Sequence, residues 1–240
     1  MVQRSHSFGA RLTRLVARIY PGVDADILAS QVIDAFWPEG THRRTRPRRP
    51  GNTLWSQRDA MLITYGDSIV DGVHKPLSLL HDFLLTHLQG VVNGVHVLPF
   101  FPWTSDDGFA VTDYRKVDGK LGDWADITRI GQDFHLMSDL VLNHVSSQSG
   151  WFNEFLQDHA PYNRFFVTAD PSDDLTAVVR PRVTPLLREV ETAAGTKHVW
   201  CTFGHDQVDL DFSNPEVLLE MLRVIRLHVD MGVRIIRLDA

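Results

Sequence analysis

Apolar residues among the first forty positions recur with the spacing of a helix. One stripe follows the pattern i, i+3, i+4 and i+7, and its members are Leu12, Leu15, Val16 and Ile19. This spacing predicts a helix over residues 8–20. A second helix is expected to begin at Asp24 or Asp26, because aspartate is a favoured N-cap, and to run toward Phe36. The two helices would form a small N-terminal appendage.

The pattern changes after residue 60. Four short runs are rich in leucine and β-branched residues, as is typical of buried strands. They occupy residues 61–65, 94–98, 136–142 and 233–239. Three helical segments lie between them, at residues 76–89, 123–134 and 214–230. This alternation of strand and helix predicts an α/β fold with a parallel sheet.

The helix over 214–230 has the clearest start signals. Ser213 and Glu216 have the spacing of a capping box, and Pro215 suits the first helical turn. The interval before it, residues 145–212, is too long for an ordinary connection between a strand and its helix. We therefore expect an inserted subdomain over residues 145–212.

The net charge of −6 is unevenly distributed. Residues 1–50 contain nine Arg against four Asp plus Glu, so residues 51–240 carry a net charge of −11. Much of the basic excess lies in "HRRTRPRRP", residues 42–50. Such a run can contact nucleic acid or anionic lipid, but its prolines and the lack of nearby aromatic residues favour a solvated linker. We therefore expect neither a nucleic-acid nor a membrane partner.

Two further features bear on the cellular compartment. No uninterrupted apolar run approaches the roughly 20 residues that span a bilayer, and the N-terminus lacks the apolar centre of a secretory signal. The single cysteine, Cys201, excludes an internal disulfide and any CxxC motif. These features predict a cytoplasmic protein.

Polar side chains gather where three of the predicted strands end, which is where parallel α/β folds place their reactive groups. The candidates are Asp106, Asp107, Phe109, Asp113 and Tyr114 after the second strand, Asp139, Asn143 and His144 at the third, and Arg237 and Asp239 at the fourth. Each has a structural alternative, because an aspartate at a strand tip is often a cap or loop anchor and aromatic rings usually pack in the core. Three successive strand tips with ionisable residues are hard to explain by packing alone.

Strand geometry predicts how the charged residues meet. Arg237 and Asp239 are two positions apart, so their side chains point the same way. A buried Asp139 needs a partner, and Arg237 on a neighbouring strand would supply it. An arginine beside Asp239 would also keep that carboxylate ionised, as a nucleophile requires.

The motifs at these strand tips resemble those of a known family. "DLVLNH" followed far downstream by "GVRIIRLDA" resembles the first two signature segments of the α-amylase superfamily of glycoside hydrolases. Within it, "LITYGDSI", "GVHVLPFFPWTSDDGFAVTDYRKVD" and "LGDWADI" look most like the sucrose phosphorylase subfamily and its relatives that act on glucosylglycerate and similar glucosides. The likeness covers about residues 53–240.

The resemblance implies the N-terminal half of a (β/α)8 TIM barrel, strands one to four, with a subdomain inserted after strand three. The expected divisions are an N-terminal helical extension (1–41), a basic Arg/Pro linker (42–52), the partial barrel (53–144 and 213–240) and the inserted subdomain (145–212).

It also implies roles for individual residues. Asp239 would be the nucleophile that forms a glucosyl ester, and Arg237 would position it. Asp106 and His144 would hydrogen-bond the glucosyl ring, and Phe109 would pack against it. Arg180 and Arg182 would face the acceptor or phosphate. Four residues near the site would be structural: Asp139, Asn143, Asp113 and Tyr114.

The general acid/base that this family uses is not found in the sequence. The resemblance implies a glutamate at the tip of the following strand and a later aspartate, and neither occurs before Ala240. The chain is therefore expected to be the N-terminal fragment of a longer protein, inactive by itself, with a separately encoded C-terminal half as one potential partner.

The implied function is that of a retaining α-glucoside phosphorylase that transfers glucose from sucrose or a related α-glucoside to phosphate. A hydrolase or transglucosidase of the same superfamily and a non-catalytic carbohydrate-binding remnant are the alternatives. The small-molecule sugar is the expected partner, inorganic phosphate the co-substrate, and neither a cofactor nor a metal is expected.

Overall fold

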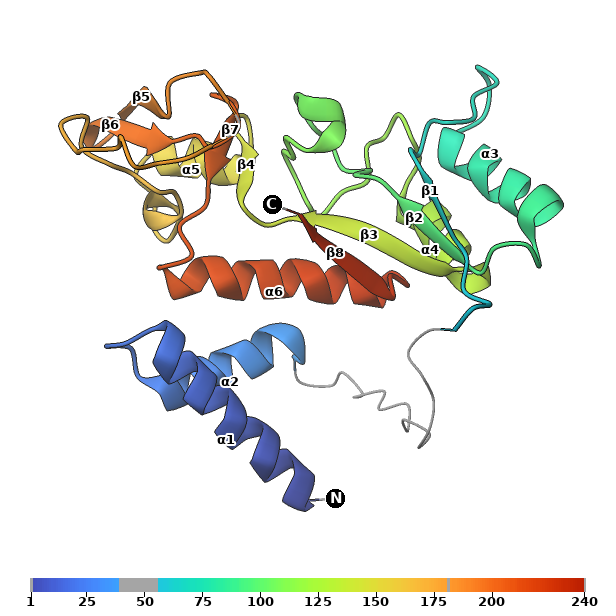
Figure 1. Ribbon diagram of the computed structural model, residues 1–240, viewed down its shortest axis with the longest axis horizontal. Helices are drawn as coiled ribbons and strands as arrows, with labels where there is room; N and C mark the ends of the chain where they lie inside the picture. The colour runs from blue at the N-terminus through green and yellow to red at the C-terminus, as the bar shows by residue number, and fades with distance from the viewer. Residues whose placement is uncertain (1, 39–55, 181, 240) are drawn as a thin grey trace.

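The computed structural model describes residues 2–38, 56–180 and 182–239, and the side chains from residue 8 onward. The linker expected over residues 42–52 lies outside the described residues. A four-stranded parallel sheet is the centre of the fold, with the strand order β1-β2-β3-β8 (Figure 1). Its strands are β1 (Met61–Thr64), β2 (Gly94–Val97), β3 (His135–Val141) and β8 (Ile235–Asp239). The strands lie where the sequence predicted them.

Three helices follow the strands along the chain, as predicted: α3 (Pro76–Phe83), α4 (Trp124–Asp133) and α6 (Pro215–Asp230). Helix α3 continues directly into a π-helical segment, η1 (Leu84–Leu88). Asp123 and Asp126 form a capping box at the start of α4. The prediction for α6 was wrong in one detail, since its cap is Asn214, whose side chain accepts from the Glu216 N–H, and not Ser213. The backbone N–H of Ser213 instead donates to the Asp211 carboxylate at 2.9 Å.

The main core fills the space between the sheet and these helices. Its fully buried members include Leu77, Leu80, Val95, Val97, Ile127, Ile130, Leu136, Leu140, Val217 and Val224. Burying such side chains stabilises the fold by about 1.5–3 kcal/mol each before the entropy cost of ordering them. This packing gives the carboxyl ends of β2, β3 and β8 fixed relative positions, and the candidate residues lie there.

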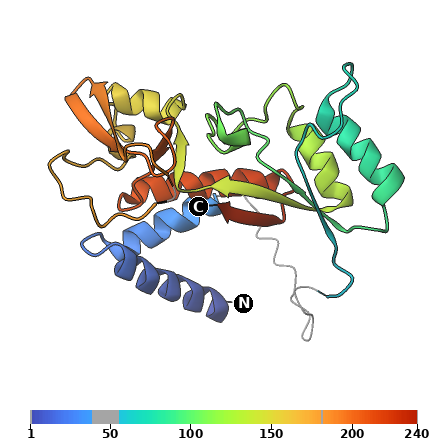
Figure 2. The same ribbon diagram turned by 45° about the horizontal axis from the view of Figure 1, so that its top comes forward.

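In its described residues, the segment between β3 and α6 contributes no strand to the parallel sheet. Its elements are β4 (His144–Ser146), α5 (Gly150–Leu156), the turn η3 (Tyr162–Arg164), β5 (Leu187–Thr192), β6 (Gly195–Trp200) and β7 (Gln207–Asp209). Strands β5 and β6 form an antiparallel hairpin, and β4 pairs with β7. The segment lies beside the N-terminal end of α6 (Figure 2). The pairing of β4 with β7 places Gln207 opposite Ser146 and Asp209 opposite His144.

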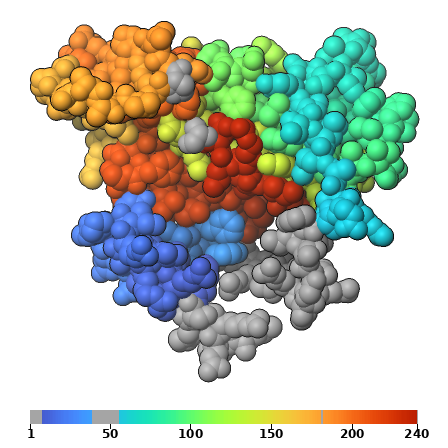
Figure 3. Space-filling model, in the orientation of Figure 1, coloured from blue at the N-terminus to red at the C-terminus, as the bar shows by residue number. Residues whose placement is uncertain are grey.

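The N-terminal helices α1 (Val2–Ile19) and α2 (Ala25–Phe36) pack on α6 (Figure 3). Asp24 caps α2, as predicted, by accepting from the backbone N–H groups of Asp26 and Ile27. A second, smaller core joins the three helices through Val16, Tyr20, Leu28, Ala29, Ala35 and Leu219. In the described part of the chain, no helix combines the length and apolar character that crossing a membrane requires.

Candidate active site

The carboxyl ends of β3 and β8 are joined by an ion pair. Asp139 lies opposite Arg237 in the parallel register, and the Arg237 guanidinium donates to the Asp139 carboxylate. Asp139 is completely buried, so its charge would be strongly destabilising without a partner. The predicted pairing of Arg237 with Asp139 is confirmed.

Arg237 also contacts Asp239, two positions further along β8. Its Nη2 lies 2.8 Å from the Asp239 Oδ1, so the two side chains share one face of the strand, as predicted. The hydrogen bond to Asp139, with the charges of Asp139 and Asp239, raises the pKa of Arg237. No hydrogen bond to the Asp239 carboxylate is found among the described residues, and Arg237 contacts one of its oxygens as an ion pair. One of its carboxylate oxygens is therefore held in place, and the other is available to a ligand.

A histidine that the sequence analysis did not select completes this group. The Nε2 of His96, in β2, lies 2.6 Å from the Asp139 Oδ2, and both side chains are buried. Asp139 thus has a partner on each carboxylate oxygen, one from each neighbouring strand. The line His96, Asp139, Arg237 and Asp239 crosses three adjacent strands and fixes the orientation of the last carboxylate.

A second group of polar side chains lies at the start of β4. Asp106 belongs to the short 3-10 turn η2 (Asp106–Gly108), and both Asp106 and Asp107 have positive φ angles, of 58° and 49°. Non-glycine residues rarely adopt this conformation, and they do so mostly where the surroundings require it. The Gln207 side-chain amide donates to the Asp106 Oδ2 at 2.9 Å and lies 3.1 Å from the His144 Nε2. The structure therefore brings Asp106 and His144 together through Gln207.

The His144 imidazole is buried between polar and aromatic neighbours. Burial lowers its pKa, which favours the neutral ring. Its Nε2 lies 3.1 Å from the carbonyl of Phe109, and its ring packs against Phe203 with the centroids 5.0 Å apart. Its Nδ1 and the Asn143 Nδ2 are buried and have no hydrogen-bond partner among the described residues. Buried polar atoms without partners are rare, and a bound polar ligand is one way to satisfy them.

Phe109 lies between the two groups of polar residues. Its backbone carbonyl is next to His144, and its ring lies 5.9 Å from the guanidinium of Arg237. This distance allows a cation–π contact. The aromatic ring therefore forms a surface beside the carboxylate that Arg237 holds.

Tyr114 and Asp113 lie on different sides of this arrangement. The buried hydroxyl of Tyr114 is 2.6 Å from the carbonyl of Val141 and 3.0 Å from that of His144, and burial raises its pKa, with a smaller contribution from the charge of Asp239. Asp113 instead accepts from the Arg115 N–H and pairs with Lys116 at 3.0 Å. Both residues belong to the loop between β2 and α4, but Tyr114 contacts the end of β3 and the start of β4, whereas Asp113 contacts residues of its own loop.

The two arginines of the inserted segment occupy different environments. The Arg180 Nη1 lies 3.3 Å from the carbonyl of Thr202 and 3.5 Å from that of Cys201. The Arg182 guanidinium is 6.0 Å from the ring of Phe203, which in turn packs against His144. The ring of Phe203 therefore lies between Arg182 and His144. Arg180 instead binds backbone carbonyl groups of its own segment.

Comparison with known proteins identifies the family. Residues 72–240 match the catalytic domain of alpha amylases. The chain belongs to the α-amylase family. The resemblance seen in the sequence motifs is confirmed, and the four-stranded parallel sheet corresponds to half of this family's TIM barrel.

Several phosphorylases of the α-amylase family are similar to the chain. Glucosylglycerate phosphorylase of Allomeiothermus silvanus is 54% identical over 193 residues, which cover 80% of this chain and 34% of that protein. Sucrose phosphorylase of Streptococcus mutans is 35% identical and is matched over 39% of its length. The solved structure of sucrose 6F-phosphate phosphorylase from Thermoanaerobacter thermosaccharolyticum has a TM-score of 0.71 and 31% identity, over 78% of this chain and 41% of that one. The chain spans about a third of the length of the most similar of these relatives.

Three residues at the site were not selected from the sequence: His96, Phe203 and Gln207. His96 carried a usable signal, because it is a polar residue within an otherwise apolar strand run, on the strand beside Asp139. Gln207 begins a segment, 207–218, that also resembles the family, but its contact with His144 depends on the pairing of β4 with β7, and Phe203 precedes β7. Among the described residues, no cluster of three or more side chains suited to a metal ion was found.

Proposed function

We propose that this chain carries the nucleophile and glucosyl-binding residues of a retaining α-glucoside phosphorylase. The observation that carries the proposal is the ion pair between Arg237 and Asp239, together with the hydrogen bond from Arg237 to the buried Asp139. It holds one carboxylate at a strand end, as a nucleophilic mechanism requires. The phosphorylases that resemble the chain at up to 54% identity support the same reaction class.

In the proposed first step, Asp239 attacks the anomeric carbon of an α-glucoside. The bond to the leaving oxygen breaks, a general acid gives that oxygen a proton, and a β-glucosyl ester forms on Asp239. In the second step, a phosphate oxygen attacks the same carbon and displaces Asp239, which yields α-glucose 1-phosphate. Two inversions give net retention of configuration.

The described residues supply the positioning for both steps. Arg237 neutralises part of the charge on Asp239 and fixes its rotamer. Asp106 and His144 are proposed to hydrogen-bond hydroxyl groups of the glucosyl ring, and the ring of Phe109 is proposed to pack against its apolar face. The leaving group is glycerate, fructose or a related acceptor, by analogy with what the relatives' names state.

Arg182 is the better of the two arginines for contact with phosphate or an acidic acceptor. Its position over Phe203, next to His144, supports this role. Arg180 is engaged with backbone carbonyl groups, so its proposed contribution is to shape the loop that presents Arg182.

We propose that the general acid/base comes from outside these 240 residues. A retaining mechanism needs a second carboxyl group about 5–5.5 Å from the nucleophile. The described glutamates lie on α5, β5 and α6, and none is at the carboxyl end of a strand in the parallel sheet. We also propose that further strands, in the same polypeptide or a separate one, pair along β8, where Leu238 is 63% exposed.

A hydrolase or transglucosidase would use the same nucleophile with water or a sugar hydroxyl as acceptor. A chimera distinguishes a phosphorylase from a hydrolase. In this chimera, residues 53–240 of this chain replace the matching segment of the Allomeiothermus silvanus phosphorylase. We expect release of glucose 1-phosphate that depends on phosphate. Release of free glucose at the same rate without phosphate would favour the hydrolase.

A further inference from the structure

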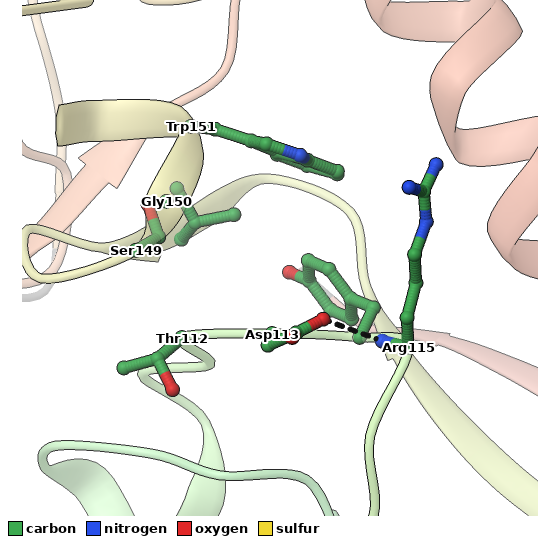
Figure 4. Close-up of a pocket in the computed structure, with 8 residues that line it drawn as sticks. Thr112, Asp113, Arg115, Ser149, Gly150 and Trp151 are labelled. Carbon is green, nitrogen blue, oxygen red and sulfur yellow. Dashed lines mark hydrogen bonds between the residues drawn. The ribbon is translucent and has the colours of Figure 1, made fainter. Parts of the chain in front are cut away.

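A small cavity lies next to Tyr114. It encloses about 210 Å³ and is lined by residues 112–115, Val145 of β4 and the start of α5. Figure 4 shows the ring of Trp151 across the cavity from Asp113 and Arg115. Neither Asp239 nor Asp106 nor His144 lines it, so it is separate from the proposed glucosyl site.

Aromatic rings form one wall of this cavity. The ring centroids of Tyr114 and Trp151 are 5.6 Å apart, with an angle of 37° between the ring planes. Phe165 makes a T-shaped contact with Trp151, with the ring centroids 5.9 Å apart. The indole N–H of Trp151 donates to no described residue. The wall therefore offers both an apolar ring face and a free hydrogen-bond donor, a combination suited to a ligand with C–H and hydroxyl groups.

The charged groups in the lining already have partners. Asp113 pairs with Lys116 at 3.0 Å, and Arg115 pairs with Glu220 of α6. A charged ligand would have to displace one of these partners. A neutral ligand would not, since its hydroxyl groups could share the Asp113 carboxylate and the Arg115 guanidinium with these partners. They could also bond to the hydroxyl of Ser149, whose oxygen accepts from the Phe152 N–H.

Size restricts the ligand further. The cavity is smaller than the roughly 300–1,000 Å³ typical of drug-sized ligands, and it suits a molecule with a single ring. We propose that this cavity binds one neutral monosaccharide or a polyol of similar size. The site goes beyond the proposed glucosyl site and does not depend on it.

The test uses the 240-residue chain with 15N-labelled tryptophan and D-glucose as the probe. We expect a saturable change in the chemical shift of the Trp151 indole N–H at millimolar glucose. In saturation-transfer measurements, Trp151→Phe should weaken glucose binding by about tenfold. Trp103→Phe is the matched control, because Trp103 lies outside the cavity lining, and it should bind as the unaltered chain does.

Two further variants separate this cavity from the glucosyl site and from a folding defect. Asp106→Asn should leave the Trp151 shift unchanged, and Asp113→Asn should weaken binding without loss of packing. Circular dichroism confirms that each variant is folded. The proposal is overturned if the Trp151 signal does not move, or if Asp106→Asn abolishes the shift while Trp151→Phe retains full binding.

Discussion

Arg237 and Asp239 are two positions apart on β8, and 2.8 Å separates the Nη2 of the first from the Oδ1 of the second. The same guanidinium donates to Asp139, which is buried and also bonded to His96. The orientation of Asp239 therefore depends on residues of two neighbouring strands.

Replacing Arg237 should destabilise the chain because Asp139 loses one of its two partners. We expect Arg237→Gln to lower the free energy of unfolding by about 1–3 kcal/mol, less than for a fully buried pair because the Arg237 side chain is 43% exposed. Urea denaturation measures the change. Arg234→Gln is the control, on an exposed side chain nearby, and should stay within about 0.5 kcal/mol. Equal losses in the two variants would contradict the account.

His228 should make stability depend on pH. Burial against Phe101 and Trp124 lowers its pKa to about 4, whereas an unfolded histidine titrates near 6.5. The contribution of the neutral ring is fully present above pH 6.5 and is lost as the pH falls from there toward 4. The loss reaches roughly 3 kcal/mol at most.

Urea unfolding at pH 7 and pH 5 measures this effect. The variant His228→Phe keeps an aromatic ring over Phe101 and should reduce the pH dependence, while His135→Gln, on an exposed residue, should keep it. An unchanged pH dependence in His228→Phe would show that other groups are responsible.

Gln207 should affect donor binding and turnover, because its amide holds Asp106 and contacts His144. In the active chimera, Gln207→Leu should lower kcat/KM for phosphorolysis by about tenfold to a hundredfold, the equivalent of losing about 1–3 kcal/mol. Gln148→Leu, on an exposed residue of the same segment, serves as the control. No change in Gln207→Leu would mean that Asp106 is held by other contacts.

Two glycines in helices should respond oppositely to alanine. A Cβ on Gly131 of α4 would lie 3.0 Å from the carbonyl oxygen of Gly232, so Gly131→Ala should destabilise the chain by about 1–3 kcal/mol. A Cβ on Gly9 of α1 meets nothing within 4 Å, so Gly9→Ala should stabilise α1 by about 0.5–1 kcal/mol. Thermal unfolding of both variants checks the signs, and destabilisation by both would contradict the packing described.

The sequence was most informative where periodicity and alternation decide the structure. The parity of positions in β8 placed Arg237 and Asp239 on one face, and the cost of burying Asp139 required a nearby cation. It was least informative where contacts join distant segments. Neither Gln207 nor Phe203 has a local pattern that predicts its position next to His144, because the tertiary fold of the inserted segment brings them there: Gln207 lies in β7, which pairs with β4, and Phe203 precedes that strand.

The N-cap of α6 shows a second kind of feature that the sequence alone could not predict. Ser213 and Asn214 are both favoured N-cap residues, and their spacing to Glu216 differs by one position. Only the backbone conformation, with Asn214 extended and Pro215 in the first turn, decides between them.

The central claim is that Asp239 is the nucleophile, and mass spectrometry of the trapped intermediate tests it most directly. The chimera, with its general acid/base removed, is incubated with α-glucosyl fluoride and digested. The account predicts one added glucosyl group on the peptide that contains Asp239, and none in Asp239→Asn. A glucosyl group on a different peptide, or fluoride release without any labelled peptide, would contradict it.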